Sequence, residues 1–302
     1  MPKFVSNVVV LLATFNGEKF IERQLDSIYS QKDVSVTVYV RDDGSTDKTV
    51  AIIKSYPAPL GRLVVLESTK NGGSAALNFL EMILHIDVQN KSCICFADQD
   101  DIWLPYKLRT ALNRISEGYD LYSSSLTAFS EGKDNTSNIK GKVIFKKFDY
   151  LFQGLSAGCT YVLSPSFFTF VQKKIVEKKL ILEAGFSHDW LIYTLARSHE
   201  FTIYHDKNSY ILYRQHANNV QGSLLGLRGV LYRGMNIWEN WYYDQIMFNR
   251  NFIRNTPDEV KILNALKSKN ILFLIRNCLE FRRSFPECIA LLIFLLLRKR
   301  ND

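Results

Sequence analysis

Three carboxylates lie within four positions at the end of the segment Ser92–Asp101, which reads SCICFADQDD. Small and apolar residues suited to a buried strand come first, and Asp98, Asp100 and Asp101 follow. Because side chains alternate along an extended segment, Asp98 and Asp100 can point to one side at the carboxyl end of that strand. Carboxylates held that close repel unless a cation lies between them, and hard divalent metals prefer oxygen ligands. The spacing predicts a metal-bound phosphate or diphosphate, and the structural alternative is a surface turn of solvated acids.

A second group of acids occupies Asp42–Asp47, which reads DDGSTD and follows another predicted strand. Gly44 suits a tight turn, and Asp47 can cap the next helix. These local roles leave Asp42 and Asp43 as paired acids that could accept hydrogen bonds from a ribose or a base. The spacing does not rank one of the two above the other.

The elements that position these acids alternate between strand and helix through the first third of the chain. Such a series predicts a mostly parallel sheet with right-handed crossovers, and ligands of such sheets bind beyond the carboxyl ends of the strands. Asn16 is the expected cap of a first helix whose apolar residues recur at helical spacing. The strands are predicted at Asn7–Ala13, Val34–Val40, Arg62–Leu66 and Ser92–Ala97, and the later helices at Lys48–Tyr56 and Ser74–Ile86.

The pattern is mixed in the middle of the chain and purely helical near its end. We predict a helix at Trp103–Ile115, a strand at Tyr119–Phe129, a polar loop at Ser130–Lys142, and short strands at Tyr161–Leu163 and Phe201–Tyr204. Beyond about Ser223 the sequence becomes aromatic, basic and helical, without a sheet signal. We therefore predict a domain of residues 1–222 and a helical C-terminal region of residues 223–302.

Composition bounds the class of protein. The chain has 302 residues, 47% hydrophobic and 23% charged, which excludes wholesale disorder. Its net charge of +8 fits an anionic partner, but the basic residues are too dispersed to indicate nucleic acid. Five cysteines, an odd number, argue for a reducing compartment. The run Val8–Ala13 is too short for a signal peptide, and no stretch has the length to span a bilayer, so we expect a cytoplasmic protein.

Three motifs together carry a family resemblance: LLATFNGEKFIERQLDSI, VRDDGSTDKT and FADQDDIW. The chain resembles the inverting glycosyltransferases of family 2, which have the GT-A fold, a Rossmann-like α/β sheet flanked by helices. Within that family it resembles the rhamnosyltransferase-like members that build bacterial surface polysaccharides. The resemblance covers about Val8 to Gly222, and the DQDDIW, SHDW and YRQHANN runs are its more specific parts.

The resemblance implies roles for residues of the donor site. It places Thr14, Asn16 and Asp42 or Asp43 in the nucleotide pocket. It places Asp98 and Asp100 on the ribose, the diphosphate and a Mg²⁺ or Mn²⁺ ion, which would neutralise charge on the departing nucleoside diphosphate. In one departure, many members carry Ala-Arg-Asn in the helix after the third strand, where this chain has Ala76-Leu77-Asn78. A phosphate contact from that arginine is lost or supplied elsewhere.

The resemblance also implies an acceptor base and a closing loop. In Ser187-His188-Asp189-Trp190, Asp189 is the expected base that takes the proton from the acceptor hydroxyl, with His188 orienting it. His188 and Trp190 are assigned to the acceptor or sugar pocket, and a helix N-cap is the structural alternative for Ser187 or Asp189. In the YRQHANN run, Tyr213–Asn219, Arg214 is expected to clamp diphosphate oxygens and His216 to bind near the metal. The alternative for His216 is a structural or solvent-exposed histidine.

Two enzymes of other classes compete for the same residues. The run Gly154–Gly158 matches the GxSxG elbow of serine hydrolases, with Ser156 as nucleophile and Asp189 and His216 in the expected order. That assignment leaves both acidic groups unexplained, so the small residues, Gly158 among them, fit better as a wall of the sugar pocket. A haloacid dehalogenase-type phosphatase would carry its acid pair on the first strand. A non-catalytic nucleotide sensor or scaffold is the remaining alternative.

The C-terminal region carries a second interaction signal. Cys288–Leu297 is a ten-residue apolar run followed by Arg298-Lys299-Arg300, which is too short to span a bilayer but suits a helix on an anionic leaflet. The alternative is a core or homodimer helix. We expect peripheral contact with the inner face of the cell membrane. The expected donor is dTDP-rhamnose, with UDP-hexose or UDP-N-acetylhexosamine as alternatives, and the expected acceptor is a glycan or lipid-linked glycan.

Overall fold

The computed structural model describes residues 6–60, 62–67, 73–131, 137–139, 143–178, 186–215 and 241–297. The chain divides into two compact units that each draw on separate stretches of sequence. The sheet unit contains Met1–Gly141, Ser156–Asp189 and Phe201–Gln215, and the helical unit contains Lys142–Leu155, Trp190–Glu200 and His216–Asp302. The predicted domain boundary at Gly222 lies outside the described residues.

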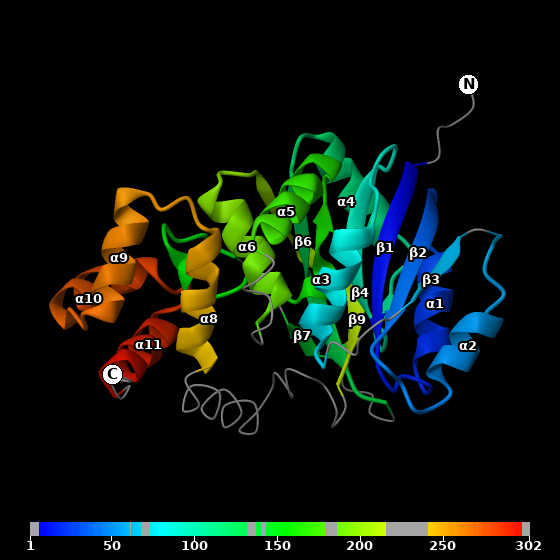
Figure 1. Cartoon of the computed structure of the whole chain (residues 1–302), viewed down its shortest axis with the longest axis horizontal. Helices are drawn as coiled ribbons and strands as arrows, with labels where there is room; N and C mark the ends of the chain where they lie inside the picture. Colours follow the sequence, from blue (N-terminus) through cyan, green and yellow to red (C-terminus); the bar gives the residue numbers. More distant parts are fainter. Residues whose placement is uncertain are drawn as a thin grey trace. The chain divides into compact units, whose positions relative to one another are not determined.

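One sheet forms the centre of the sheet unit, with the strand order β3-β2-β1-β4-β8-β6-β9-β5 and with β7 paired to β6 (Figure 1). The strands β3, β2, β1 and β4 pair in parallel, as the sequence predicts. The far half is mixed, because β8 runs antiparallel to both β4 and β6. The strands are β1 (Ser6–Thr14), β2 (Val34–Asp42), β3 (Leu63–Leu66), β4 (Cys93–Asp98), β5 (Ile102–Trp103), β6 (Leu121–Phe129), β7 (Ser137–Ile139), β8 (Val162–Leu163) and β9 (Ile203–Arg214).

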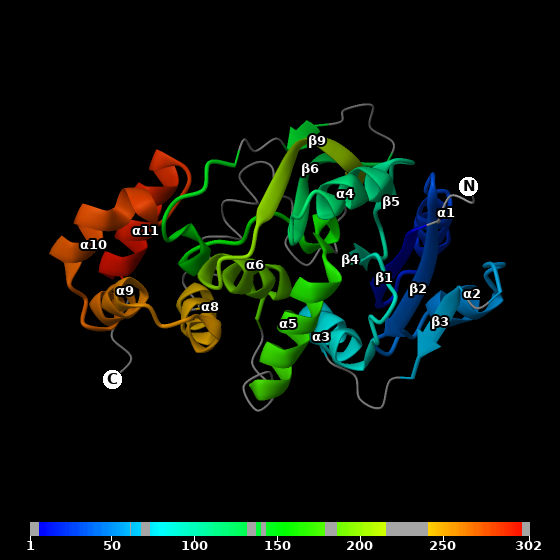
Figure 2. The same cartoon turned by 90° about the horizontal axis from the view of Figure 1, so that it is seen from above.

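Helices cover both faces of this sheet, which explains the unbroken apolar run of β1. Figure 2 shows α1 and α4 on one face and α3 and α5 on the other. Val8 to Leu12 are completely buried, as expected of a parallel strand covered on both sides. Two of the helices begin at serine caps, because Ser74 accepts a bond from Leu77 and Ser164 one from Phe167. The helices are α1 (Ile21–Tyr29), α2 (Thr49–Ser55), α3 (Ala75–His85), α4 (Lys107–Ser116) and α5 (Pro165–Glu177).

Four local predictions were wrong. Within the polar loop predicted at Ser130–Lys142, Ser137–Ile139 form the strand β7, which pairs with β6. Asn16 does not cap α1, which begins at Ile21; its φ of 48° places it in a left-handed turn. The predicted helix at Trp103–Ile115 begins only at Lys107, because Ile102 and Trp103 pair with β9. The short strand predicted at Phe201–Tyr204 begins at Ile203 and continues as β9 to Arg214, since this segment pairs in parallel with β6, with two register shifts.

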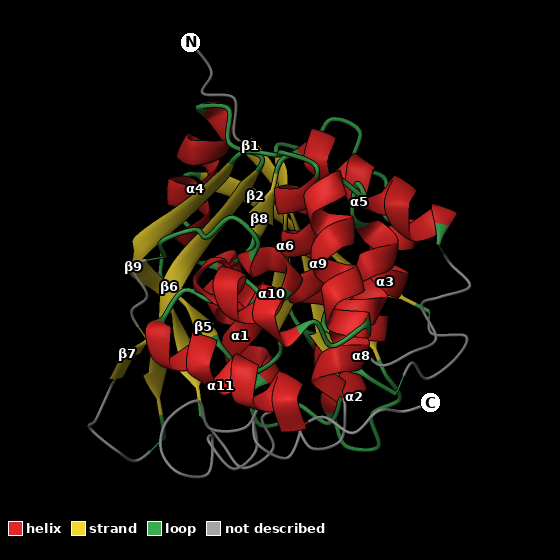
Figure 3. Cartoon of the chain, turned by 90° about the vertical axis from the view of Figure 1, so that its left-hand side faces the viewer, coloured by secondary structure: helices red, strands yellow, loops and turns green. Residues whose placement is uncertain are grey.

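Helices make up the described part of the helical unit (Figure 3). Its core includes Asp149, a completely buried carboxylate that pairs with Arg197 at 3.0 Å and with Arg283 at 2.8 Å. The predicted absence of strands beyond Ser223 is confirmed for the residues that are described. None of the described helices is long and apolar enough to cross a membrane. The helices are α6 (His188–Ser198), whose first two residues belong to the sheet unit, α8 (Trp241–Asn249), α9 (Pro257–Lys267), α10 (Ile271–Asn277) and α11 (Phe285–Leu297).

Candidate active site

The acids that follow β2 have separate partners. Asp42 holds the turn: Oδ2 accepts a bond from Thr14 Oγ1 at 2.8 Å, and Oδ1 accepts bonds from the backbone N–H groups of Gly44 and Ser45. Asp43 is buried and accepts a bond from the Gly73 N–H at 2.9 Å. The structure therefore assigns Asp42 to the turn between two strand ends and Asp43 to the loop before α3, a distinction that spacing alone did not provide.

A buried arginine lies beside Asp43. Arg41 Nη1 is 3.6 Å from Asp43 Oδ1 and donates to Asn78 Oδ1 at 2.9 Å, while Asn78 Nδ2 donates back to the Arg41 carbonyl at 3.0 Å. This reciprocal pair fixes the first turn of α3, which contains Leu77. Arg41 thus supplies a guanidinium at the carboxyl end of β2.

Gln99, which the sequence analysis did not single out, joins the loop after β1 to the acidic turn after β4. Its amide exchanges two bonds of 2.8 Å with the backbone of Phe15. A Cβ added to Gly17 would lie 2.2 Å from Gln99 Oε1, so this approach needs a glycine. Asn16 completes the loop by accepting a bond from the Thr46 N–H at 2.9 Å. Phe15 and Asn16 are thereby held over the ends of β1 and β2.

The acidic turn contains a group of donor atoms suited to a cation. One donor atom each of Asp98, Asp101 and Cys159 lies within 4.8 Å of the others. Asp101 is buried, and its Oδ2 lacks a well-aligned hydrogen-bond donor among the described residues. Such an orphaned carboxylate oxygen is a ligand that Mg²⁺ or Mn²⁺ would satisfy. Asp100 stands beside this group, half-buried, and its charge acts on both neighbouring aspartates.

Burial and mutual repulsion change the protonation of this cluster. Burial, followed by the charges of Asp100 and Asp189, raises the pKa of Asp98 to about 7. Burial, followed by the charges of Asp98 and Asp100, raises the pKa of Asp101 well above its ordinary value. A bound cation would offset both effects, because an opposite charge favours the ionised carboxylates.

A lysine that sequence reasoning missed lies beneath the acidic turn. Lys107 is completely buried, and its Nζ is 3.4 Å from the centroid of the Trp103 ring. Burial lowers its pKa, while the acidic groups Cys95, Cys159 and Asp101 act against that shift. No spacing in LPYKL distinguishes this lysine from a surface lysine.

The predicted base lies close to the cluster. Asp189 is buried in the first turn of α6, accepts a bond from Ser187 Oγ, and is near enough for its charge to raise the pKa of Asp98. His188 packs on Phe79 with 4.4 Å between ring centroids, and burial lowers its pKa, so that the imidazole is neutral. A Cβ on Gly158 would lie 2.4 Å from His188 Nε2. Gly158 therefore leaves the space that the His188 ring fills.

The remaining predicted residues are in different settings. Arg214 ends β9 and is buried rather than part of a flexible loop; its Nε donates to the Asp100 carbonyl at 2.8 Å. A contact between Arg214 and a diphosphate stays a prediction. His216 lies outside the described residues. Trp190 is buried in the helical unit, where its indole N–H donates to the Tyr150 carbonyl at 2.8 Å.

Ser156 lacks the surroundings of a hydrolase nucleophile. An elbow serine sits between a strand and the helix that follows it. Here a 3₁₀ turn, Gly158–Thr160, comes after Ser156, and its Oγ donates to the Ser124 carbonyl at 3.3 Å. The GxSxG match is therefore a coincidence of sequence.

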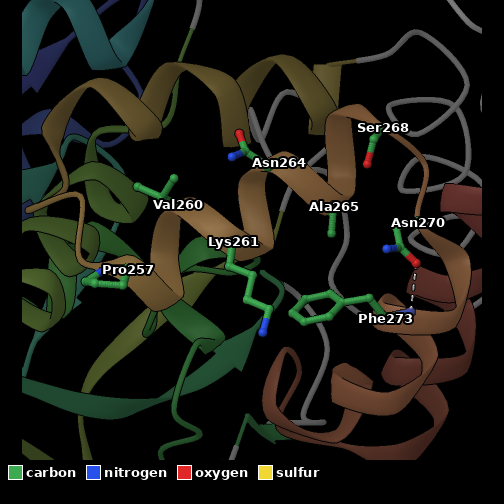
Figure 4. A pocket seen from close by; sticks show the side chains of 8 residues that line it. All are labelled: Pro257, Val260, Lys261, Asn264, Ala265, Ser268, Asn270 and Phe273. Atoms are coloured by element: carbon green, nitrogen blue, oxygen red, sulfur yellow. Dashed lines mark hydrogen bonds between the residues drawn. The ribbon is translucent and has the colours of Figure 1, made fainter.

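Outside this site, a hollow of about 390 Å³ lies between α9 and α10 of the helical unit (Figure 4). Lys261 is its one ionisable lining residue, and its Nζ is 5.4 Å from the Phe273 ring centroid. The hollow shares no residue with the acidic cluster.

Acids at the ends of parallel strands, a group suited to a cation among them and a further acid at a nearby helix start are the arrangement expected of a glycosyltransferase with the GT-A fold. The glycosyl transferase family 2 pattern matches residues 9–178, and the chain belongs to that family.

Two curated relatives illustrate the similarity. The chain is 32% identical over 295 residues to dTDP-rhamnosyl transferase RfbG of Shigella flexneri, a match that covers 95% of this chain and 99% of the relative. It is 24% identical over 223 residues to the GalNAc(5)-diNAcBac-PP-undecaprenol beta-1,3-glucosyltransferase of Campylobacter jejuni, covering 71% of this chain and 66% of the relative.

Solved structures share the fold. S. aureus TarS 1-349 in complex with UDP-GlcNAc matches with a TM-score of 0.56 and 18% identity, covering 94% of this chain and 83% of that one. The mannosyltransferase PcManGT from Pyrobaculum calidifontis, in complex with GDP-Man and Mn²⁺, matches with a TM-score of 0.54 and 16% identity, covering 97% and 80%. At these identities the likeness concerns the fold.

Proposed function

We propose that this glycosyltransferase moves L-rhamnose from dTDP-rhamnose to a hydroxyl of a growing bacterial surface glycan, with inversion at the anomeric carbon. The proximity of Asp189 to Asp98 carries the proposal, because it brings a base to the acids expected to hold the donor. The near full-length similarity to a protein named as a dTDP-rhamnosyl transferase supports the choice of sugar. UDP-hexose and UDP-N-acetylhexosamine are the alternative donors.

On the donor side, the loop after β1 and the turn after β2 would hold the nucleoside. The hydrogen bond from Thr14 to Asp42 fixes the turn after β2. Asn16, which accepts a bond from Thr46, and Asp43 would then contact the base and the ribose. Asp98 would contact the ribose and diphosphate. Arg41, buried beside Asp43, is a candidate source of positive charge where Leu77 replaces an arginine.

A divalent cation, Mg²⁺ or Mn²⁺, would be held by Asp98 and Asp100, with Asp101 and Cys159 in reach and His216 as a further candidate ligand. When bound, it supplies positive charge to the departing diphosphate. Arg214 contributes indirectly: its Nε donates a hydrogen bond to the Asp100 carbonyl, which fixes the backbone that carries these carboxylates.

On the acceptor side, Asp189 would remove the proton of the attacking hydroxyl. The hydroxyl oxygen forms a bond to the anomeric carbon while the bond from that carbon to the diphosphate oxygen breaks on the opposite face. The bond from Ser187 Oγ orients the carboxylate, and the packed ring of His188 with Gly158 forms a wall beside it. No covalent sugar–enzyme intermediate is needed.

The acceptor is proposed to be a lipid-linked glycan. Support comes from the Campylobacter relative, whose name includes a PP-undecaprenol-linked acceptor. Trp190, predicted to line the acceptor pocket, is held by the Tyr150 carbonyl and packs on Tyr242 with 5.5 Å between ring centroids.

The first test is thermal stability with dTDP, UDP and GDP compounds, each with Mn²⁺ or with EDTA. A ligand that binds only the native state raises the melting temperature, so dTDP-rhamnose with Mn²⁺ should give the largest rise. Asp100→Asn should abolish the metal-dependent part, whereas Asp87→Asn, which removes an exposed acid outside the site, should not. A larger rise with a UDP-sugar would select the alternative donor. Nucleotide binding without transfer to any lipid-linked glycan would favour a sensor or scaffold.

A further inference from the structure

The chain that follows α9 exposes a row of large apolar side chains. Leu272, Ile275 and Leu279 are between 48% and 73% exposed. They recur at i, i+3 and i+7 along α10 and the 3₁₀ turn Cys278–Glu280 that follows it. This spacing places the three side chains on one face of a helix, so they form a stripe rather than scattered exposure.

The helix α11 exposes a second row. Phe285, Ile289 and Ile293 are between 44% and 65% exposed and recur at i, i+4 and i+8. Glu287 is the single charged residue of this helix, and a helix that is apolar on all sides is normally buried. Its opposite side packs inward through Cys288 and Leu291. We call the two triplets the apolar rows; large apolar side chains exposed in rows, rather than singly, are typical of an interaction site.

Much of the chain's net positive charge lies in the same segment. Residues 267–300 contain eight Lys or Arg against two Glu, an excess of six, whereas the whole chain has a net charge of +8. Arg282 and Arg283 are compensated inside the unit, by Glu287 at 3.3 Å and Asp149 at 2.8 Å. The others include exposed Arg276 and the run Arg298-Lys299-Arg300 directly after α11. The segment therefore combines apolar rows with basic residues. This combination suits a binding partner whose surface is both apolar and negatively charged.

We propose that α10 and α11 dock on an anionic lipid bilayer through the apolar rows, with the basic residues on the headgroups. An α-helix of thirteen residues is about 20 Å long, too short for a hydrocarbon core of about 30 Å, so α11 lies in the interface. A second copy of the chain would not explain why the basic excess gathers here, since two such surfaces repel each other. The proposal goes beyond sugar transfer and does not rest on the donor or acceptor.

The test is flotation of the full chain with vesicles of phosphatidylcholine alone or with about one third phosphatidylglycerol, without donor or acceptor. We expect binding to the anionic vesicles that weakens as salt is raised. Ile289→Ser with Ile293→Ser should weaken it by about tenfold or more, because each substitution removes the burial of a large apolar side chain. The matched control is Val176→Ser, which replaces an exposed apolar residue of α5 outside the rows.

Circular dichroism of the variants would check that they fold, which exposed positions should allow. Replacing Arg298, Lys299 and Arg300 by Ala should reduce binding to anionic vesicles while leaving the fold intact. Absence of binding to anionic vesicles would overturn the proposal. A dimer in sedimentation that Ile289→Ser with Ile293→Ser dissociates, together with no vesicle binding, would assign the rows to a second copy.

Discussion

Replacing Gly158 by alanine tests whether the close approach of Gly158 to the His188 ring fixes the position of that ring beside the predicted base, Asp189. The new Cβ would lie 2.4 Å from His188 Nε2, although contacts of such atoms are ordinarily at 3.4 Å or more. The ring must therefore move by about 1 Å, but it is packed on Phe79, with 4.4 Å between ring centroids, and on Phe96. Movement of His188 also displaces its neighbour in the helix, Asp189.

The expected cost has two parts. Overpacking of a filled site destabilises by about 1–3 kcal/mol. A displacement of about 1 Å at a reacting group can lower the rate by about 10²-fold. Donor affinity should change little, because the contacts of Asp42 and Asp43 are made elsewhere. The loss should therefore appear in kcat rather than in the KM for the nucleotide sugar.

The assay is a double-mutant cycle with His188→Ala, read by urea unfolding and by initial rates. Removing the ring removes the clash, so Gly158→Ala should cost at least about 1 kcal/mol less in the His188→Ala background than alone. The free energy of unfolding gives the coupling directly. Equal costs in both backgrounds, or a Gly158→Ala protein as stable and active as the parent, would refute the reasoning.

Three further predictions follow from the acidic site. Asp189→Asn should lower kcat by about 10²–10⁴-fold while calorimetry shows unchanged donor binding, and an unchanged rate would exclude Asp189 as the base. The pKa of Asp98 is about 7 in the folded protein, above its value in the unfolded chain, so the folded protein binds more protons between about pH 4 and pH 7. Through this group the metal-free protein therefore loses stability as the pH rises across that range. Urea midpoints measured across that range in EDTA should fall, and Asp98→Asn should flatten the change. Lys107→Met should cost about 2 kcal/mol in thermal unfolding, because it removes a buried ammonium held 3.4 Å from the centroid of the Trp103 ring, and an unchanged stability would contradict this.

The sequence was most informative where a local pattern decides the structure. The apolar run of β1 reports burial on both faces directly, and the acids after β2 and β4 follow strands that could be recognised. Features that depend on tertiary contacts were not recoverable. Asn16 has the residue type of a helix cap, but its side chain bonds to Thr46, thirty positions away, and the first helix starts later. Local pattern could not reveal this.

Other parts of the site were hidden for the same reason. Cys159 enters the acidic site because the 3₁₀ turn Gly158–Thr160 packs on β4. Neither Cys159 nor Lys107, the first residue of α4, has a distinctive neighbour in sequence. Gln24 could have been found: it is a completely buried polar residue on the apolar face of α1, and its side chain donates to the Asp98 carbonyl at 2.9 Å. A polar residue on an otherwise apolar helix face was an available signal.

The buried carboxylate of Asp149 has a consequence for the order in which the protein matures during synthesis. Its partners are Arg197, 48 positions later, and Arg283, 134 positions later. All strands of the sheet unit have been synthesised by Arg214, whereas Asp149 still lacks Arg283. At ribosomal rates of about 5–20 residues per second, the interval is on the order of ten seconds. During it Asp149 has Arg197 but still lacks Arg283, its second partner, so completion of the helical unit waits for almost the last residues of the chain.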